Sequence, residues 1–114
     1  MTDALPTPNE ADLAALQNSA AAAARLMRLF ANEHRLMLMC RLAQGECAAG
    51  GLAAFVGLSQ SACSQHLARL RDEGVIASRR AAQTLFYGIV DPAAVRVIAQ
   101  LSDIYRDNPK EPTA

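Results

Sequence analysis

The spacing of the apolar residues changes at Gly74, and this change limits the folds that the chain can adopt. Before the glycine, apolar residues recur at the three- and four-residue spacing of a helix face: Cys63, Leu67 and Leu70. After it they alternate with their neighbours, as in a half-buried strand: Leu85, Tyr87 and Ile89. The chain is therefore predicted to pass directly from a helix into a β-hairpin.

The helix before Gly74 has a clear predicted start, and a second helix precedes it. Ser59 is a strong N-cap, and Leu58 and Cys63 can pack across it as a hydrophobic staple. A weaker short helix is expected around residues 52–56, ending at Gly57. Two helices joined by so tight a turn predict a helix-turn-helix.

The hairpin after Gly74 is predicted to have a cationic tip. Its first strand is expected over residues 75–78 and its second over residues 84–89, which leaves residues 79–83 as the tip. Arg79 and Arg80 lie in this tip. A cationic hairpin directly after a helix-turn-helix is the arrangement of a wing, whose arginines can reach phosphates or the minor groove.

The rest of the chain predicts helices at both ends of this unit. Thr7 as N-cap, Pro8 and Glu10 predict the start of a first helix. Its apolar residues follow a heptad pattern: Leu13, Leu16, Ala20, Ala23, Met27 and Phe30. The pattern suits a core helix or a dimerisation helix, and we favour the second. Asn32 can cap a second helix, and Asp91-Pro92 starts the last one.

Together these elements predict a mainly α fold with a small β-hairpin: a dimeric winged helix-turn-helix of five helices and a two-stranded wing. We expect a disordered leader over residues 1–8, one domain over residues 9–107 and a disordered tail over residues 108–114. The chain of 114 residues is long enough for one domain with a modest core.

Composition narrows the class of protein. No apolar run reaches the ~18 residues of a membrane span, and the first nine residues lack a signal-peptide core. Three cysteines, an odd number, argue against a disulfide framework. We therefore expect a cytoplasmic protein with no membrane partner. The net charge is zero, but four arginines lie between Arg69 and Arg80, so one face can still be basic.

The helix that begins at Ser59 has the exposed face that DNA reading needs. Glutamine and serine can hydrogen-bond base edges, and small side chains let a helix approach the floor of the major groove. A surface helix of another function would normally be rich in Glu and Lys, which this face lacks before Asp72. The candidate DNA-binding residues are Ser59, Gln60, Ser61, Ser64, Gln65, His66, Arg69, Arg79, Arg80, Gln83 and Thr84.

Four segments resemble the ArsR/SmtB family of bacterial winged-helix repressors. They are Ala31-Asn32-Glu33-His34-Arg35-Leu36, residues 58–61, residues 64–71 with the block Ser64-Gln65-His66-Leu67, and residues 83–87. The resemblance covers about residues 10–107 and is greatest to the branch of sulfide- and persulfide-responsive regulators and the metal-independent nodulation regulator. It implies a homodimer built by the first and last helices, and binding to an operator in double-stranded DNA that an inducer weakens. Because such a dimer is two-fold symmetric, we expect the operator to be an inverted repeat.

The chain departs from the family at its metal sites. Some members carry a Cys-x-Cys pair, but the matching stretch here is Cys47-Ala48-Ala49-Gly50-Gly51. Others bind zinc with His and acidic residues of the last helix, yet residues 91–107 contain no His. A zinc site needs about four placed ligands. We therefore expect no metal and no cofactor.

The cysteines leave a thiol-sensing hypothesis open. In the resemblance, Cys40 matches one sensing cysteine of the persulfide regulators, and Arg106 falls where the second would lie. The redox-sensing candidates are therefore Cys40 and Cys47, with the charge of Arg106 expected to favour a Cys40 thiolate. The alternative is that Cys40 only packs in the core, as expected for Cys63.

Three other functions remain to be separated from a thiol-controlled repressor. The first is a metal-independent repressor that senses nothing. The second is a winged helix that binds another protein, against which Arg69, Arg79 and Arg80 argue. The third is a thiol enzyme, but no Cys–His pair, phosphate loop or carboxylate pair is evident in the sequence. We expect a protein that is not an enzyme.

Overall fold

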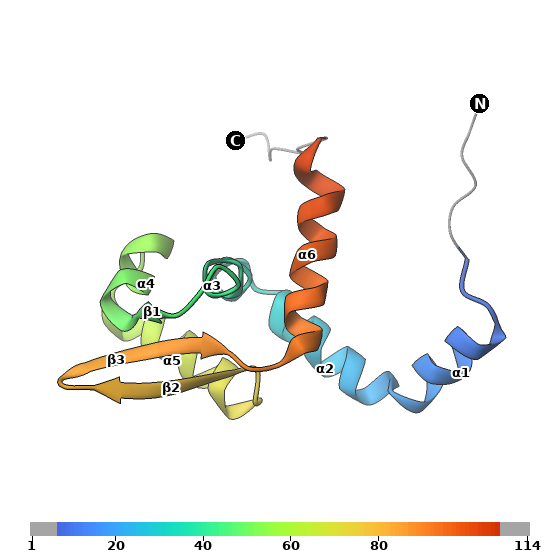
Figure 1. Ribbon diagram of the computed structural model, residues 1–114, viewed down its shortest axis with the longest axis horizontal. Coiled ribbons are helices and arrows are strands. Elements are labelled where there is room, and N and C mark those ends of the chain that lie inside the picture. The colour runs from blue at the N-terminus through green and yellow to red at the C-terminus, as the bar shows by residue number, and fades with distance from the viewer. Residues whose placement is uncertain (1–6, 108–114) are drawn as a thin grey trace.

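The computed structural model describes residues 7–107 as a mainly helical fold with one small antiparallel sheet (Figure 1). The elements are α1 Glu10–Asn18, α2 Ala20–Phe30, α3 Glu33–Leu42, β1 Cys47–Ala48, α4 Ala49–Val56, α5 Gln60–Asp72, β2 Ile76–Ala81, β3 Thr84–Ile89 and α6 Pro92–Arg106. Helices α4 and α5 form a helix-turn-helix, and β2 and β3 form the wing that follows it. The predicted winged helix-turn-helix is therefore confirmed.

The core lies where α3, α4 and α5 meet one face of the sheet and the start of α6. The largest fully buried side chains come from α3, α4, α5 and β2: Leu38, Met39, Leu52, Cys63, Leu67, Leu70 and Ile76. Ala94 and Ile98 add the first turns of α6 to the same cluster. Among the described residues no polar or charged residue is buried, so the core is held by apolar packing alone.

The sheet has three strands in the order β1-β3-β2, one more than the predicted wing. Cys47 pairs with Tyr87 and Ala48 with Phe86, so a short strand before α4 joins the edge of the hairpin. Two residues of an isolated strand give no periodic pattern, which is why the sequence did not predict β1. The strand ties the wing to the first helix of the helix-turn-helix.

The predicted first helix is two helices, so the described chain has six helices and not five. The break is at Ser19, whose backbone leaves the helical region with φ −114° and ψ 12°. Ser and Asn compete with the helix by bonding nearby backbone groups, and Asn18-Ser19 places both types together. The heptad pattern therefore crosses a break that apolar spacing does not show.

The start of this helix also differs from the prediction. The N-cap is Asn9 and not Thr7, and α1 begins at Glu10. The Asn9 side chain accepts from the Asp12 amide at 2.8 Å, and the Asp12 carboxylate accepts from the Asn9 amide at 3.1 Å. This reciprocal capping box satisfies two backbone donors and fixes the start two residues later than expected. Most of the predicted leader and all of the predicted tail lie outside the described residues.

The first strand of the wing is longer than predicted. It runs to Ala81, so Arg79 and Arg80 belong to β2 and the turn contains only Ala82 and Gln83. Ala82 adopts a φ of +56°, which an alanine rarely does. The prediction ended the strand too early because residues 79–83 are cationic and polar. Arg79 and Arg80 are nevertheless paired in the strand, opposite Phe86 and Leu85.

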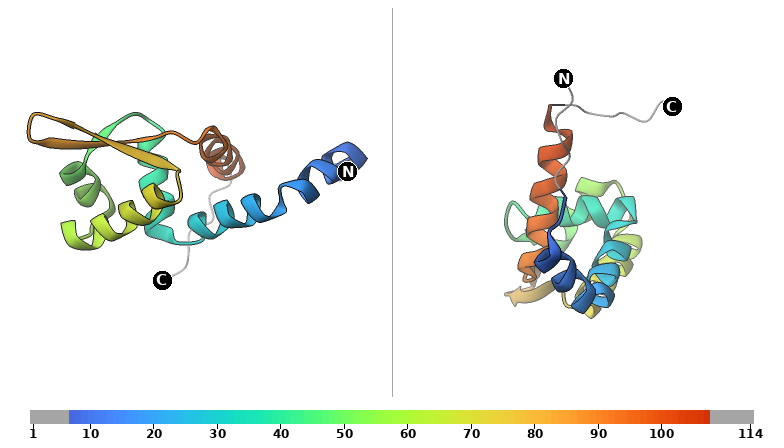
Figure 2. Two further views of the ribbon diagram at one scale, coloured as in Figure 1. Left: turned by 90° about the horizontal axis from the view of Figure 1, so that it is seen from below. Right: turned by 90° about the vertical axis from the view of Figure 1, so that its right-hand side faces the viewer.

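Helices α1 and α2 extend away from this body toward one side of the molecule (Figure 2). No residue of α1 is buried, and Leu13 and Leu16 are 50% and 54% exposed. Met27 on α2 and Ile104 and Tyr105 on α6 are also exposed. The two ends of the described chain thus present apolar side chains that the monomer does not cover. No described helix is long and apolar enough to cross a membrane.

Candidate nucleic-acid interface

The turn between α4 and α5 is set by Gly57 and Ser59. Gly57 caps α4 in the left-handed region with φ +72°, where a side chain would be strained. Two residues later the Ser59 hydroxyl accepts a hydrogen bond from the Ala62 amide at 3.1 Å, as predicted for an N-cap. The tight turn presents the N-terminal end of α5, with its free amides and positive dipole end, at the surface.

One face of α5 packs in the core, and the other is free. Cys63, Leu67 and Leu70 are buried. The polar residues predicted to read bases are exposed: Gln60, Ser61, Ser64 and Gln65. The first turn contains no acidic residue, and Arg69 and Arg71 lie in the last turn. This surface therefore offers donors and acceptors without a charge that would repel phosphate.

Gln60 is exposed like the others, but its side chain does not project outward from α5. A Cβ atom added at Gly50 would lie 3.8 Å from Gln60 Nε2, so the Gln60 amide lies over the start of α4. The outward polar positions of α5 are Ser61, Ser64 and Gln65.

His66 lies at the junction of α5 with α3. Its ring centroid is 5.7 Å from that of His34, and the two rings are tilted by 36°. Burial lowers the pKa of His66, and the positive charges of Arg35 and His34 lower it further. Arg35 itself donates from Nε to the Leu29 carbonyl at 3.0 Å. This environment therefore favours the neutral form of His66.

The two arginines of the wing have different surroundings. Arg80, Gln83 and Thr84 are exposed near the turn. Arg79 instead donates from Nε and Nη2 to the carboxylate of Glu46, with a shortest distance of 2.8 Å. Its guanidinium also lies 4.9 Å from the centroid of the Phe86 ring. Sequence reasoning missed Glu46, because no local spacing connects two residues 33 positions apart.

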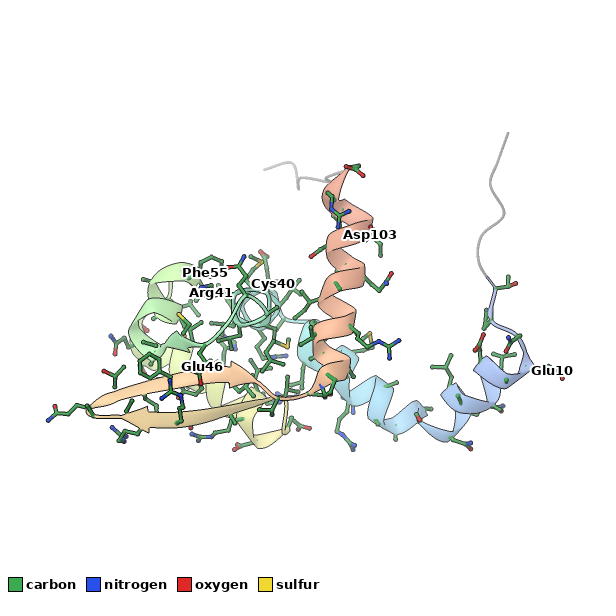
Figure 3. All side chains as sticks on the ribbon, viewed as in Figure 1. Glu10, Cys40, Arg41, Glu46, Phe55 and Asp103 are labelled. Atoms are coloured by element: carbon green, nitrogen blue, oxygen red, sulfur yellow. The ribbon has the colours of Figure 1, made fainter. Side chains whose placement is uncertain are left out.

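The cysteines occupy three different environments. Cys63 is 1% exposed, so the expectation that it packs in the core is met. Cys40 is half-buried in an open apolar cleft between α2, α3 and α6, with Phe30, Leu36 and Tyr105 (Figure 3). Cys47 is half-buried in β1, and its Sγ lies 3.2 Å from the position of a Cβ at Gly51.

The expected effect of Arg106 on Cys40 is wrong. Arg106 pairs with Asp103 on its own helix, with Nη1 3.4 Å from Oδ1. Burial raises the pKa of the Cys40 thiol, so the thiolate is disfavoured. Among the described residues no three His, Cys, Asp or Glu side chains are grouped so that they could hold a metal ion.

Comparison with known proteins identifies the family. Residues 32–78 match the family model described as bacterial regulatory protein, arsR family. The HTH-type transcriptional regulator YgaV of Escherichia coli K12 is 45% identical over 95 residues, which cover 82% of this chain and 96% of YgaV. The chain belongs to the ArsR family. It is a DNA-binding transcriptional regulator, and the predicted family is confirmed.

Two solved structures of ArsR-type relatives share the fold. Reduced HlyU from Vibrio cholerae N16961 has 39% identity and a TM-score of 0.75, and the match covers 79% of this chain and 95% of that one. The transcriptional repressor BigR from Xylella fastidiosa has 30% identity and a TM-score of 0.77, with 81% and 94% covered. HlyU of Vibrio cholerae is named as a transcriptional activator.

Proposed function

We propose that this ArsR-family regulator binds an inverted-repeat operator as a homodimer, with α5 in the major groove and the wing beside it. The observation that carries the proposal is the exposed face of α5, where Ser61, Ser64 and Gln65 project without an acidic neighbour in the first turn. Glutamine and serine at the N-terminal end of a recognition helix are suited to base edges. Arg69, Arg80, Gln83 and Thr84 are assigned to the DNA backbone and the adjacent groove.

The dimer is proposed from the apolar side chains that the monomer leaves uncovered on α1, α2 and α6. Packing these helices against a second copy removes that surface from water. A two-fold dimer then places two α5 helices toward half-sites about one helical turn apart, roughly 34–36 Å.

We propose repression as the outcome of binding, as for the relative BigR, and a cytoplasmic site of action with no catalytic step. The name of HlyU makes activation the alternative. Transcription from the protein's own promoter should be measured in a purified system. A decrease on adding the protein indicates repression, and an increase indicates activation. A winged helix that binds only another protein would leave that transcription unchanged and would not shift the promoter DNA.

Two substitutions test the proposed interface. Gln65→Ala should weaken binding to the operator by about 1–3 kcal/mol and relax sequence preference, because it removes a base contact. Arg80→Gln should weaken binding to every sequence alike and reduce the slope of log K against log salt by about 0.9, because it removes one phosphate contact. Arg41→Gln, on α3 and outside the proposed DNA and dimer surfaces, is the matched control. Unchanged sequence preference in Gln65→Ala would contradict the assignment of α5.

We further propose that modification of Cys40 by a polysulfide or peroxide releases the operator. Support comes from its place on α3 in a cleft beside α2 and α6, two of the helices that carry the proposed dimer surface. An added sulfur or oxygen atom would have to be accommodated among these helices. The raised pKa of Cys40 implies slow reaction near neutral pH, and faster reaction as the pH rises.

The same treated sample should be measured by mass spectrometry and by gel shift. If Cys40 is the sensor, Cys40→Ser remains on DNA after treatment, whereas Cys47→Ser is released like the parent protein. If Cys40→Ser is released as well, Cys40 is a packing residue only. A parent protein that stays bound throughout would instead identify a regulator without thiol sensing.

A further inference from the structure

The two neighbouring arginines of the wing lie on opposite faces of the sheet. In the β2–β3 pairing, Arg80 is opposite Leu85 and Arg79 is opposite Phe86. Directly paired residues share a face, and successive residues of a strand alternate between faces. Arg80 thus lies on the same face of the sheet as Leu85 and Tyr87. This is the inner face, because Tyr87 is buried against the helices. Arg79 lies on the outer face, away from α5.

Arg79 on this outer face is bound within the protein. Its guanidinium makes a forked contact with the Glu46 carboxylate through Nε and Nη2, at 2.8–3.1 Å. The same group lies over the Phe86 ring. A forked arginine–carboxylate pair fixes orientation as well as distance, and stacking on an aromatic ring restricts the guanidinium plane further.

Glu46 reaches this position from the loop before β1. Because Cys47 pairs with Tyr87, Glu46 comes opposite Gly88 on the outer face of β3. A Cβ atom at Gly88 would lie 3.3 Å from Glu46 Cγ, so the missing side chain makes room for the glutamate (Figure 3). The contact thus joins β2 to the segment that leads into α4, across the whole width of the sheet.

We propose that Arg79 is a positioning residue, which holds the wing at a fixed angle to the helix-turn-helix through Glu46, and that Arg80 is the arginine of the pair that contacts DNA. This inference rests on the proposed operator binding. It assigns opposite roles to two adjacent residues of the same type and charge. A phosphate could take the place of Glu46 only by breaking the forked contact and leaving the carboxylate near the DNA without its partner.

The sign of the effect of Glu46→Gln distinguishes the two roles. If Arg79 contacts phosphate, removal of the competing carboxylate should tighten binding to the operator. If Arg79 positions the wing, Glu46→Gln should weaken binding by about two- to fivefold, the range expected for the loss of one exposed ion pair. Arg79→Lys gives an independent comparison, because it keeps the positive charge but loses the fork. We expect it to weaken binding as much as Arg79→Gln, with an unchanged salt slope in both.

Arg80→Gln is the matched control, since it should reduce the salt slope where the variants of Arg79 do not. Tighter binding by Glu46→Gln, or parent-like binding by Arg79→Lys, would overturn the inference. Hydrogen exchange without DNA adds a second readout: the β2 and β3 amides should exchange faster in Glu46→Gln and in Arg79→Lys, and equal exchange would also count against the inference. If the parent protein does not bind its operator, the proposed function fails. The exchange measurement still tests whether the contact between Arg79 and Glu46 holds the wing in place.

Discussion

At the scale of single residues, His66 has an environment that the sequence alone did not indicate. The ring lies beside Arg35 and His34 of α3, whereas the sequence indicated only a candidate DNA-binding residue within the Ser-Gln-His-Leu block. Its lowered pKa means that the folded protein resists a proton that the unfolded chain accepts.

This difference predicts a loss of stability with acid. As the pH falls toward 6.5, the ordinary pKa of a histidine, the unfolded state takes up a proton at His66 before the folded state does. The free energy of unfolding should therefore decrease between about pH 7.5 and pH 5.5, and the decrease should be smaller in His66→Gln. Urea unfolding at both pH values measures it. His34→Gln, which removes one of the groups that lower the pKa of His66, should fall between the two proteins. An equal decrease in parent and His66→Gln would show that other groups control this pH range.

Individual residues of the interface were predictable where the signal is local. Ser59 as a cap and Ser61, Ser64 and Gln65 as an exposed polar face follow from spacing along one helix. The partner of Arg79 did not follow, because Glu46 is brought to it by strand pairing. The environment of Cys40 was missed for the same reason: the orientation of Arg106 depends on Asp103 and on how α6 packs.

At the scale of elements, the two-residue turn of the wing contains a residue unsuited to it. Ala82 is the one non-glycine residue with positive φ among residues 7–107. Ala82→Gly should raise the free energy of unfolding by about 0.5–1 kcal/mol, because glycine adopts this backbone without a Cβ clash. Ala81→Gly, one position earlier in β2, should instead lower it by about 0.5–1 kcal/mol. Thermal or urea unfolding of both variants checks the opposite signs. A loss of stability in Ala82→Gly would mean that the turn is not strained.

The elements themselves were predictable in proportion to their length and periodicity. The starts of α3, α5 and α6 at Asn32, Ser59 and Asp91 agree with their caps. The break at Ser19 and the strand β1 did not follow from the sequence. A helix can continue through a serine when neighbouring packing supports it, and two residues pair as a strand only when an edge is already present.

At the scale of the whole molecule, the uncovered apolar surface predicts a dimer whose stability depends on concentration. Light scattering should give twice the 12.1 kDa mass of the chain at micromolar concentration. The melting temperature should rise with protein concentration, because association stabilises only the folded state. Leu13→Ser combined with Leu16→Ser should shift the mass toward the monomer.

Phe55→Ser provides the matched control for this experiment. Phe55 on α4 is 51% exposed, which is close to the exposure of Leu13 and Leu16. It lies outside the helices assigned to the dimer (Figure 3). The control should keep the dimer mass. A parent mass of one chain, or a shift caused by Phe55→Ser alone, would contradict this assignment of the interface.

The register of the wing restricts how its length can vary. Six residues in each strand at about 3.3 Å per residue give the hairpin a length of about 20 Å, and the two-residue turn adds no slack. Adding one residue to each strand would exchange the faces of Arg79 and Arg80, whereas adding two would restore them. One such double step lengthens the hairpin by about 6.6 Å. A hairpin of this kind can therefore lengthen only in steps of two residues per strand if Arg79 and Arg80 are to keep their faces.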